Sequence, residues 1–253
     1  MMITATIITL NEAQNIRDCI LSVQQVCDEV IVVDSLSSDN TVDIARSLGA
    51  TVYQQEYLGD GPQKAFGVTY AKNSWILSID ADERLEEDAV SAIRNLDLDN
   101  SRCDGYSFKR RNYVGQHWIR AAGFYPDRVV RLYHKDRAGY LPKKAHSSVA
   151  GDNLCQLNAH IEHFTYENYT HWVERINALS SRDAWAMYQR GVKVHRYTPF
   201  LHATAGLIRK LVFKGGIFQG LDGLTVAITT AFHGYMKYIK LLEIHQSSKT
   251  EKE

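Results

Sequence analysis

Residues 29–34 read Glu-Val-Ile-Val-Val-Asp, a short run of apolar side chains between two acids. A continuous apolar run of this length is typical of a strand that is buried on both faces of a sheet. Similar runs occur at 3–10 (ITATIITL), 51–54 (TVYQ) and 74–80 (SWILSID). Helical patterns lie between or after these runs, at 16–23, 42–48, from Pro62 to about Ala71, and 86–96. Strands that alternate with helices predict an α/β fold with a doubly wound, mostly parallel sheet.

Beyond residue 100 the pattern predicts a small antiparallel extension and then helices. Residues 106–113 and 128–133 alternate like antiparallel strands, and the chain is mostly helical from Asn168 onward. The segments 198–213 and 221–242 mix apolar residues with Arg209, Lys210, Lys214, Lys237 and Lys240. That mixture fits helices lying in a membrane interface against anionic lipid, and equally helices packed on the main domain or on a second subunit. No apolar run reaches about 18 residues, so we expect no membrane-spanning helix.

Composition and charge exclude several classes of protein. The 253 residues are 45% apolar and 23% charged, which excludes a disordered chain, collagen and a small disulfide scaffold. The 29 basic residues balance 29 acidic ones, so no overall charge indicates a nucleic-acid partner. Residues 1–100 are acidic and residues 101–153 are basic, which suits a cation in the first part and an anionic partner in the second.

The cysteines and the amino-terminal sequence bear on the compartment. Cys19, Cys27, Cys103 and Cys155 are scattered without a CxxC pair, so we expect buried or incidental free thiols in a reducing compartment. The first residues lack a basic segment and a small-residue cleavage site, and they predict a strand rather than a signal peptide. These features together favour a cytoplasmic protein.

Polar clusters follow three of the predicted strands, at 9–12 (TLNE), 34–39 (DSLSSD) and 80–84 (DADER). Ligands of open parallel sheets bind beyond the carboxyl ends of the strands, so we expect the clusters to share one edge. Asp80 and Asp82 can present oxygens to one hard cation that completes its shell with water and substrate phosphate. The alternative is that both are loop acids exposed to water.

Asp34 ends the strand at 29–34, where its carboxylate can accept a hydrogen bond from a ribose hydroxyl or a base N–H. Its alternative role is to cap the following helix, although Ser38 and Asp39 are closer for that task. Neither a GxGxxG nor a GxxxxGK[ST] phosphate fingerprint is present. A nucleotide at this edge would therefore be held by carboxylates and a metal rather than by a glycine-rich loop.

These motifs resemble those of glycosyltransferase family 2, the inverting enzymes with the GT-A fold. The matching stretches are TLNE (9–12), VVDSxSxD (32–39), a Gly-Pro-Gln-Lys loop (61–64) and SIDADERL (78–85). A narrower group, the bacterial lipopolysaccharide-core β-1,4-glucosyltransferases that modify inner-core heptose, is similar at RRNY (110–113), GFYPD…RLY (123–133) and HFTY (163–166). The resemblance implies a catalytic domain at 1–165, with a Rossmann-like nucleotide-sugar half at 1–100 and an acceptor half at 101–165. Residues 166–253 would be a helical region that docks on a membrane or forms oligomers.

The resemblance also implies a UDP-sugar donor and a Mg²⁺ or Mn²⁺ ion. Matched by motif position, the nucleotide-sugar site would be lined by Thr9, Asn11, Glu12, Asp34, Lys64 and Asp80, with Asp34 at the uridine. Asp82 would be the principal metal ligand, and Asp80 would contact the ribose or the metal. His163 would complete the metal shell, although His160 is also available and packing histidines are the more common case.

For the base that removes the acceptor proton, the resemblance and the chemistry of carboxylates point to Asp127. Its alternative role is a salt bridge with Arg128 or Arg131, and Arg131 would contact a phosphate. His146 is a second candidate base, because Ser147 stands where relatives commonly have Glu.

The basic residues of the middle segment would steer a phosphate-bearing, lipid-anchored acceptor. They are Arg110, Arg111, Arg120, Lys143 and Lys144. The implied function is an inverting transfer of a hexose, glucose first, to a heptose hydroxyl of the lipopolysaccharide inner core, at the inner face of the cytoplasmic membrane. A polyprenyl-phosphate glycosyltransferase and a non-catalytic sugar-nucleotide-binding protein are the alternatives.

Overall fold

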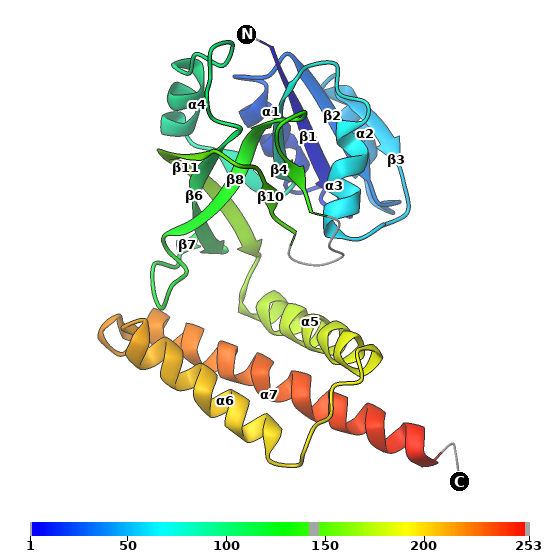
Figure 1. The fold of residues 1–253 in the computed structure, drawn as a ribbon, viewed down its shortest axis with the longest axis vertical. Coiled ribbons are helices and arrows are strands. Elements are labelled where there is room, and N and C mark those ends of the chain that lie inside the picture. Colours follow the sequence, from blue (N-terminus) through cyan, green and yellow to red (C-terminus); the bar gives the residue numbers. More distant parts are fainter. Residues whose placement is uncertain (1, 142–146, 251–253) are drawn as a thin grey trace. The chain divides into compact units, whose positions relative to one another are not determined.

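A computed structural model describes residues 2–141 and 147–250 of the chain (Figure 1). Its central feature is a parallel layer of strands that pair in the order β3 (Thr51–Gln54), β2 (Glu29–Asp34), β1 (Ile3–Thr9) and β4 (Trp75–Asp80). Val32 belongs to the core on one face of this layer, and its neighbours Ile31 and Val33 belong to the core on the other. Both faces are covered, which is why the run at 29–34 is continuously apolar. The predicted doubly wound sheet is confirmed.

The helices that cover the parallel layer are α1 (Ile16–Val23), α2 (Thr41–Ser47), α3 (Asp60–Val68) and α4 (Glu87–Arg94). Apolar residues of α1, α2 and α4 join one core, and those of α3 join the other. Helix α3 begins at Asp60, two residues before the start at Pro62 that the pattern predicted. A Cβ on Gly67 would lie 2.9 Å from Val33 Cγ2, so this glycine lets α3 lie close against β2.

Past β4 the sheet becomes antiparallel, in the order β8 (Asp127–His134), β6 (Gly105–Val114), β11 (Leu154–Tyr166) and β5 (Glu83–Leu85). Strand β7 (His117–Trp118) pairs with β6, and β9 (Gly139–Tyr140) pairs with β10 (Val149–Ala150). The expected strands at 106–113 and 128–133 are confirmed as β6 and β8, which pair antiparallel. The small antiparallel extension expected from the sequence is therefore longer than predicted, because β11 joins it.

The expectation that the cysteines are free thiols is wrong for two of them. Cys103 and Cys155 form a disulfide, with their Cα atoms 5.8 Å apart. Cys103 precedes β6 and Cys155 lies near the start of β11, and these strands are neighbours in the sheet. Strand pairing thus joins residues that are 52 positions apart in sequence. Cys19 and Cys27 are free, and Cys19 is fully buried.

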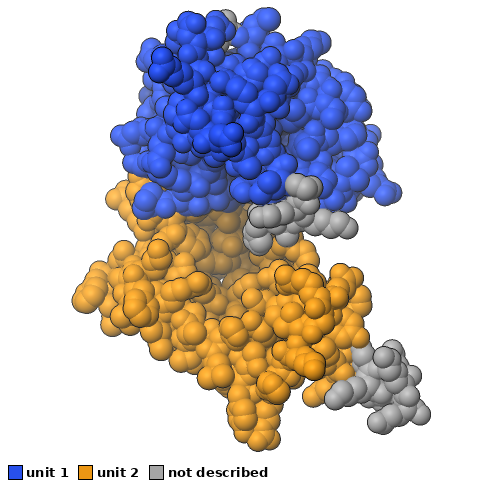
Figure 2. Space-filling model, in the orientation of Figure 1, with its two compact units in different colours: residues 1–111, 126–164 blue, residues 112–125, 165–253 orange. Residues whose placement is uncertain are grey.

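The chain forms two compact units, coloured separately in Figure 2. Unit 1 comprises residues 1–111 and 126–164, and unit 2 comprises 112–125 and 165–253. Residues 112–125 therefore group with the carboxyl-terminal helices. The division into a nucleotide-sugar half and an acceptor half stays a prediction.

Unit 2 consists mainly of helices, as the pattern after Asn168 predicted. They are α5 (Tyr169–Gln189), α6 (Thr198–Ile208), the π-helical segment η1 (Arg209–Phe213), the 3₁₀ turn η2 (Gly216–Phe218) and α7 (Gly220–Thr250). Helix α5 begins where the Asn168 side chain accepts a hydrogen bond from His171 N–H, 2.9 Å away. Within the described ranges, none of these helices combines the length and apolarity needed to cross a bilayer.

Candidate active site

The carboxyl ends of the parallel strands bring the predicted polar residues to one edge of the sheet. Thr9 pairs with Asp34 across β1 and β2, and Ile8 pairs with Asp80 across β1 and β4. Residues paired near the ends of parallel strands are neighbours, so the side chains that follow them share one small region. Thr9 is buried, and its hydroxyl makes no hydrogen bond with any described residue.

Asn11 and Glu12 fasten the loop after β1 to the loop after β2. Asn11 has a left-handed backbone with a φ of 54°, a conformation in which Asn is more frequent than most residues. Its N–H donates to Ser37 Oγ and its Oδ1 accepts from Ser38 N–H, both over 2.8 Å. The N–H of Glu12 donates to Thr41 Oγ1, also over 2.8 Å. The two residues therefore order the region expected to line the nucleotide.

Asp34 is completely buried and organises the turn that follows β2. Its carboxylate accepts from the N–H of Ser37 at 2.9 Å, from the Ser37 hydroxyl, and from Gln54 Nε2 at 3.3 Å. It does not cap α2, because Asp39 accepts from the N–H of Thr41 at the start of that helix. Contact between Asp34 and uridine stays a prediction.

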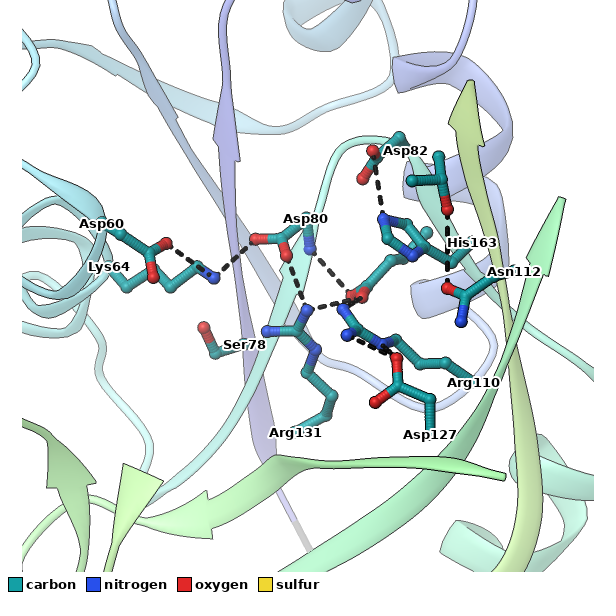
Figure 3. Close-up of polar contacts among 12 residues, drawn as sticks. Asp60, Lys64, Ser78, Asp80, Asp82, Arg110, Asn112, Asp127, Arg131 and His163 are labelled. Carbon is teal, nitrogen blue, oxygen red and sulfur yellow. Dashed lines mark hydrogen bonds and ion pairs between the residues drawn. The ribbon is translucent and has the colours of Figure 1, made fainter. Parts of the chain in front are cut away.

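Asp80 is held between two cations (Figure 3). Lys64 Nζ lies 2.9 Å from Oδ1 and 3.1 Å from Asp60, while Arg131 Nη2 donates to Oδ2 over 2.6 Å. Burial raises the pKa of Asp80, but Arg131 and Lys64 outweigh burial and hold this pKa well below its ordinary value. Oδ1 is nevertheless buried and accepts no well-directed hydrogen bond from the described residues.

Glu83 is the functional candidate that the sequence reasoning missed. It is fully buried on β5 and accepts from Arg131 over 2.5 Å and from Arg110 over 3.2 Å. The signal was present in the pattern, since Glu83 stands two positions before the apolar Leu85 and a strand directs such residues to the same face. The linked ion pairs form a continuous chain of alternating charge: Asp60, Lys64, Asp80, Arg131, Glu83, Arg110 and Asp127.

Asp82 faces His163 rather than the cations around Asp80 (Figure 3). Strand β5 pairs with β11 so that Glu83 is opposite His163, which brings His163 Nε2 to 3.4 Å from Asp82 Oδ2. Phe164 N–H also donates to the Asp82 carbonyl oxygen over 2.9 Å, which fixes the backbone at the carboxylate. Burial lowers the pKa of His163, but the Asp82 carboxylate outweighs burial and raises it above its ordinary value.

The Asp82 and His163 side chains fit one divalent cation. Adjacent ligands of an octahedral ion with bonds of about 2.1 Å lie about 3 Å apart, close to the observed 3.4 Å. A carboxylate oxygen and an imidazole nitrogen are both suitable donors for Mn²⁺, and the carboxylate is suitable for Mg²⁺. Asp80 would add a third oxygen only by releasing an ion pair with Lys64 or Arg131.

His160 lies apart from Asp82 although it is only three residues from His163. Residues three apart on a strand point to opposite faces. His160 Nδ1 is 2.5 Å from Asp88 Oδ2, and Glu86 completes a group whose donor atoms lie within 4.8 Å of one another. The structure therefore separates the two histidines and brings only His163 to the aspartate pair.

The remaining candidates occupy the antiparallel strands. Asp127 on β8 is opposite Arg110 on β6, whose Nε and Nη2 donate to Asp127 Oδ2 over 3.0 and 2.7 Å. The ion pair found for Asp127 is thus with Arg110, where the sequence suggested Arg128 or Arg131. Arg111 pairs with Glu86 over 2.5 Å. The second candidate base, His146, falls outside the described residues.

The glycosyl transferase family 2 model matches residues 4–164, which include nearly all of the sheet and every residue of the linked ion pairs from Asp60 to Asp127. The chain belongs to glycosyltransferase family 2. The motif resemblance is confirmed at the level of the family, and the chain is accordingly a transferase of glycosyl groups.

Relatives of this glycosyltransferase span nearly its whole length. An uncharacterized glycosyltransferase of Rickettsia bellii is 31% identical over 255 residues, covering 96% of this chain and 86% of the relative. The lipopolysaccharide core biosynthesis glycosyltransferase LpsC of Rhizobium meliloti is 25% identical over 252 residues, covering 96% and 93%. The solved mannosyltransferase PcManGT of Pyrobaculum calidifontis, in complex with GDP-Man and Mn²⁺, has a TM-score of 0.54 at 14% identity, covering 95% and 86%. The fold is GT-A, as predicted.

Proposed function

We propose that this glycosyltransferase moves a hexose, with glucose as the first candidate, from a UDP-sugar to a heptose hydroxyl of a lipopolysaccharide inner core, with inversion. The observation that carries the proposal is the Asp82–His163 pair beside the Asp80 ion cluster. A donor diphosphate needs positive charge and a hydroxyl-binding acceptor in one place, and this edge of the sheet offers both.

The donor half of the proposal rests on the groups around Asp80. Lys64 and Arg131 are buried cations whose pKa values rise above their ordinary range, because the carboxylate of Asp80 outweighs the opposing effect of burial. They stay charged and can stabilise a diphosphate. The Asp80 side chain keeps an exposed fraction of 23%, through which its carboxylate would accept a hydrogen bond from a ribose hydroxyl. The sugar nucleotide bound by the solved mannosyltransferase supports this donor class.

We assign the metal to Asp82 and His163, with Mg²⁺ and Mn²⁺ as the candidates. A divalent ion there would neutralise the charge that builds on the departing diphosphate. His163 must lose its proton to act as a ligand, so metal and proton compete at its Nε2. Lys64 and Arg131, already paired with Asp60, Asp80 and Glu83, would add N–H donors to the same leaving group, and the metal would supply the net positive charge.

Asp127 is the proposed base. It accepts the proton of the acceptor hydroxyl while that oxygen forms a bond to the anomeric carbon from the face opposite the diphosphate. The bond between the anomeric carbon and the diphosphate oxygen breaks at the same time, and UDP leaves with the electron pair. Arg110 orients the Asp127 carboxylate through its two hydrogen bonds to Oδ2. This geometry inverts the anomeric configuration.

The acceptor class is supported by the relative LpsC, named for lipopolysaccharide core biosynthesis. Arg110 lies beside the proposed base, and we assign it to a phosphate of the acceptor. Arg111 is the next residue on β6 and points to the opposite face, where it pairs with Glu86, so it would reach only a more distant phosphate. Such an acceptor is anchored in lipid, so the enzyme would work peripherally on the inner face of the cytoplasmic membrane.

The test is a screen of UDP-sugars against truncated core oligosaccharides, with the product detected by mass. UDP-glucose with Mg²⁺ or Mn²⁺ is expected to add one hexose to a heptose-terminated acceptor, and chelation of the metal should abolish the product. Binding of UDP-sugars without release of UDP, in any metal, would instead indicate a sugar-nucleotide-binding protein.

The acceptor base is tested by Asp127→Asn, with Asp136→Asn as the matched control because the Asp136 side chain is 70% exposed. We expect the first variant to lose about 10²–10⁴-fold in kcat, the usual contribution of a general base, and the control to retain activity. A phosphate acceptor needs little base catalysis. Full activity of Asp127→Asn on a polyprenyl phosphate would therefore replace the heptose proposal by that alternative.

A further inference from the structure

The turn between α6 and α7 exposes an unusual amount of apolar surface. Five side chains form what we term the tip surface: Val212 (61% exposed), Phe213 (78%), Ile217 (64%), Phe218 (91%) and Leu221 (78%). Helices α6 and α7 run side by side up to this turn (Figure 1). A water-soluble surface seldom gathers large apolar side chains in this way unless it contacts a partner or a membrane.

The backbone conformation of the turn is fixed by close glycine contacts and by a hydrogen bond, and it keeps these side chains exposed. Gly215 has a φ of +66°, and a Cβ on Gly223 would lie 2.0 Å from the carbonyl oxygen of Gly216. The close approach of these two backbones therefore requires glycine. Lys210 Nζ donates to the Ala122 carbonyl oxygen over 2.8 Å, which ties the turn to the 112–125 segment of unit 2.

The charges beside the tip surface are positive. Arg209 and Lys214 are exposed. Between residues 198 and 236 the acid is Asp222, and its carboxylate is paired with His117 Nε2 at 2.9 Å. An apolar surface flanked by exposed cations complements anionic lipid headgroups above an acyl layer.

We propose that the tip surface inserts into the interface of an anionic lipid bilayer and docks the chain there. A second copy is a poorer occupant, because a symmetric contact through two tips would bring Arg209 and Lys214 against the same cations. The tip surface includes fewer of the basic residues than the membrane-facing region that the sequence suggested. Lys240 lies elsewhere, since its Nζ donates to Asn177 O and Ser180 Oγ over 2.7 and 2.8 Å between α7 and α5.

The test is co-sedimentation of the full chain with vesicles of phosphatidylcholine alone or with 30% phosphatidylglycerol, in the absence of donor and acceptor. We expect binding to the anionic vesicles. Phe213→Ser/Phe218→Ser should reduce the partition coefficient about tenfold or more, because two exposed aromatic rings no longer enter the lipid. Leu21→Ser, which removes a 47%-exposed leucine from α1, is the control and should bind like the parent.

Two further measurements identify the occupant. Lys214→Gln is expected to weaken binding about fivefold on anionic vesicles and to leave neutral vesicles unchanged. Phe218→Trp should show a blue-shifted emission when vesicles are added.

Equal sedimentation of parent and Phe213→Ser/Phe218→Ser would overturn the proposal. So would a dimer in light scattering that this double variant dissociates, because the tip surface would then be a contact between copies. Neither result depends on the transfer reaction.

Discussion

The two ends of the parallel strands use charge in different ways. At the amino end, the Glu29 carboxylate accepts from Thr4 Oγ1 over 2.8 Å and from Lys72 N–H over 3.0 Å, and the Lys72 side chain is 84% exposed. At the carboxyl end, Asp80 is paired with Arg131, which is 4% exposed. One end keeps its cation in water, and the other buries it.

This contrast separates charges that hold the fold from charges kept for chemistry. Removing a cation from water costs several kcal/mol, and a buried ion pair seldom recovers more than that cost. The amino end shows that this sheet can anchor a strand terminus with an exposed lysine. The buried cations at the carboxyl end therefore exceed what folding requires, and perturbed, buried charges of this kind mark functional sites. Substitutions at the carboxyl end should lower turnover, and those that leave a buried charge unpaired should lower stability as well, whereas those at the amino end should affect stability alone.

The largest effect is expected from Asp82→Asn at the carboxyl end. Loss of the carboxylate removes the proposed metal ligand, and charge stabilisation of a leaving group by a metal is worth several kcal/mol, so kcat should fall about 10³-fold. Mn²⁺ binding, followed by electron paramagnetic resonance, should weaken in parallel. Asp88→Asn is the matched control, because it alters the second donor group around His160. Loss of Mn²⁺ binding in Asp88→Asn but not in Asp82→Asn would move the metal to that group.

The second effect concerns Glu83, which joins both arginines of the charged chain. Glu83→Gln leaves Arg131 and Arg110 short of a buried counter-charge, which should lower the free energy of unfolding by about 3–5 kcal/mol in urea titrations. The exposed Glu87→Gln on α4 is the control and should stay within about 0.5 kcal/mol of the parent. An unchanged urea midpoint for Glu83→Gln would mean that the ion chain contributes nothing to folding.

The sequence predicted the parallel half of the sheet well because its signals are local. The run at 29–34 lies between covered faces, and the polar clusters after it and after 74–80 fall at one edge for purely topological reasons. The antiparallel half depends on pairing between distant segments. Strand β5 is three residues long, so its alternation is a weak signal, and nothing in the sequence indicates the pairing with β11 that brings His163 to Asp82.

Pairing between distant strands also explains why the sequence did not predict the role of Glu83 or the disulfide. Glu83 becomes the centre of an ion chain only when β8 and β6 supply Arg131 and Arg110 from distant positions. The pairing of Cys103 with Cys155 likewise follows from the neighbouring positions of β6 and β11, which spacing in sequence does not reveal. Residue type identified the chemistry at this edge, and long-range strand pairing determined its partners.

The smallest effect is expected at the amino end, from Glu29→Gln. Burial raises the pKa of Glu29, but hydrogen bonds from Lys72 N–H and Thr4 and the Lys72 ammonium together lower it below its ordinary value. Ionised Glu29 therefore stabilises the fold above the unfolded-state pKa of about 4.3, and this contribution is lost as pH falls through the lower folded-state value. Glu29→Gln should lose about 1 kcal/mol at pH 7, with turnover unchanged.

The difference in unfolding free energy between parent and Glu29→Gln should accordingly shrink as urea titrations move from pH 7 to pH 3, while Glu56→Gln, at an exposed position, should match the parent throughout. A loss that stayed constant down to pH 3 would assign the effect to packing rather than to the charge of Glu29. If the turnover of Glu29→Gln fell as far as that of Asp82→Asn, the distinction between the two ends of the sheet would be lost. A charge at the opposite end of the strands from the proposed site would then serve catalysis as well.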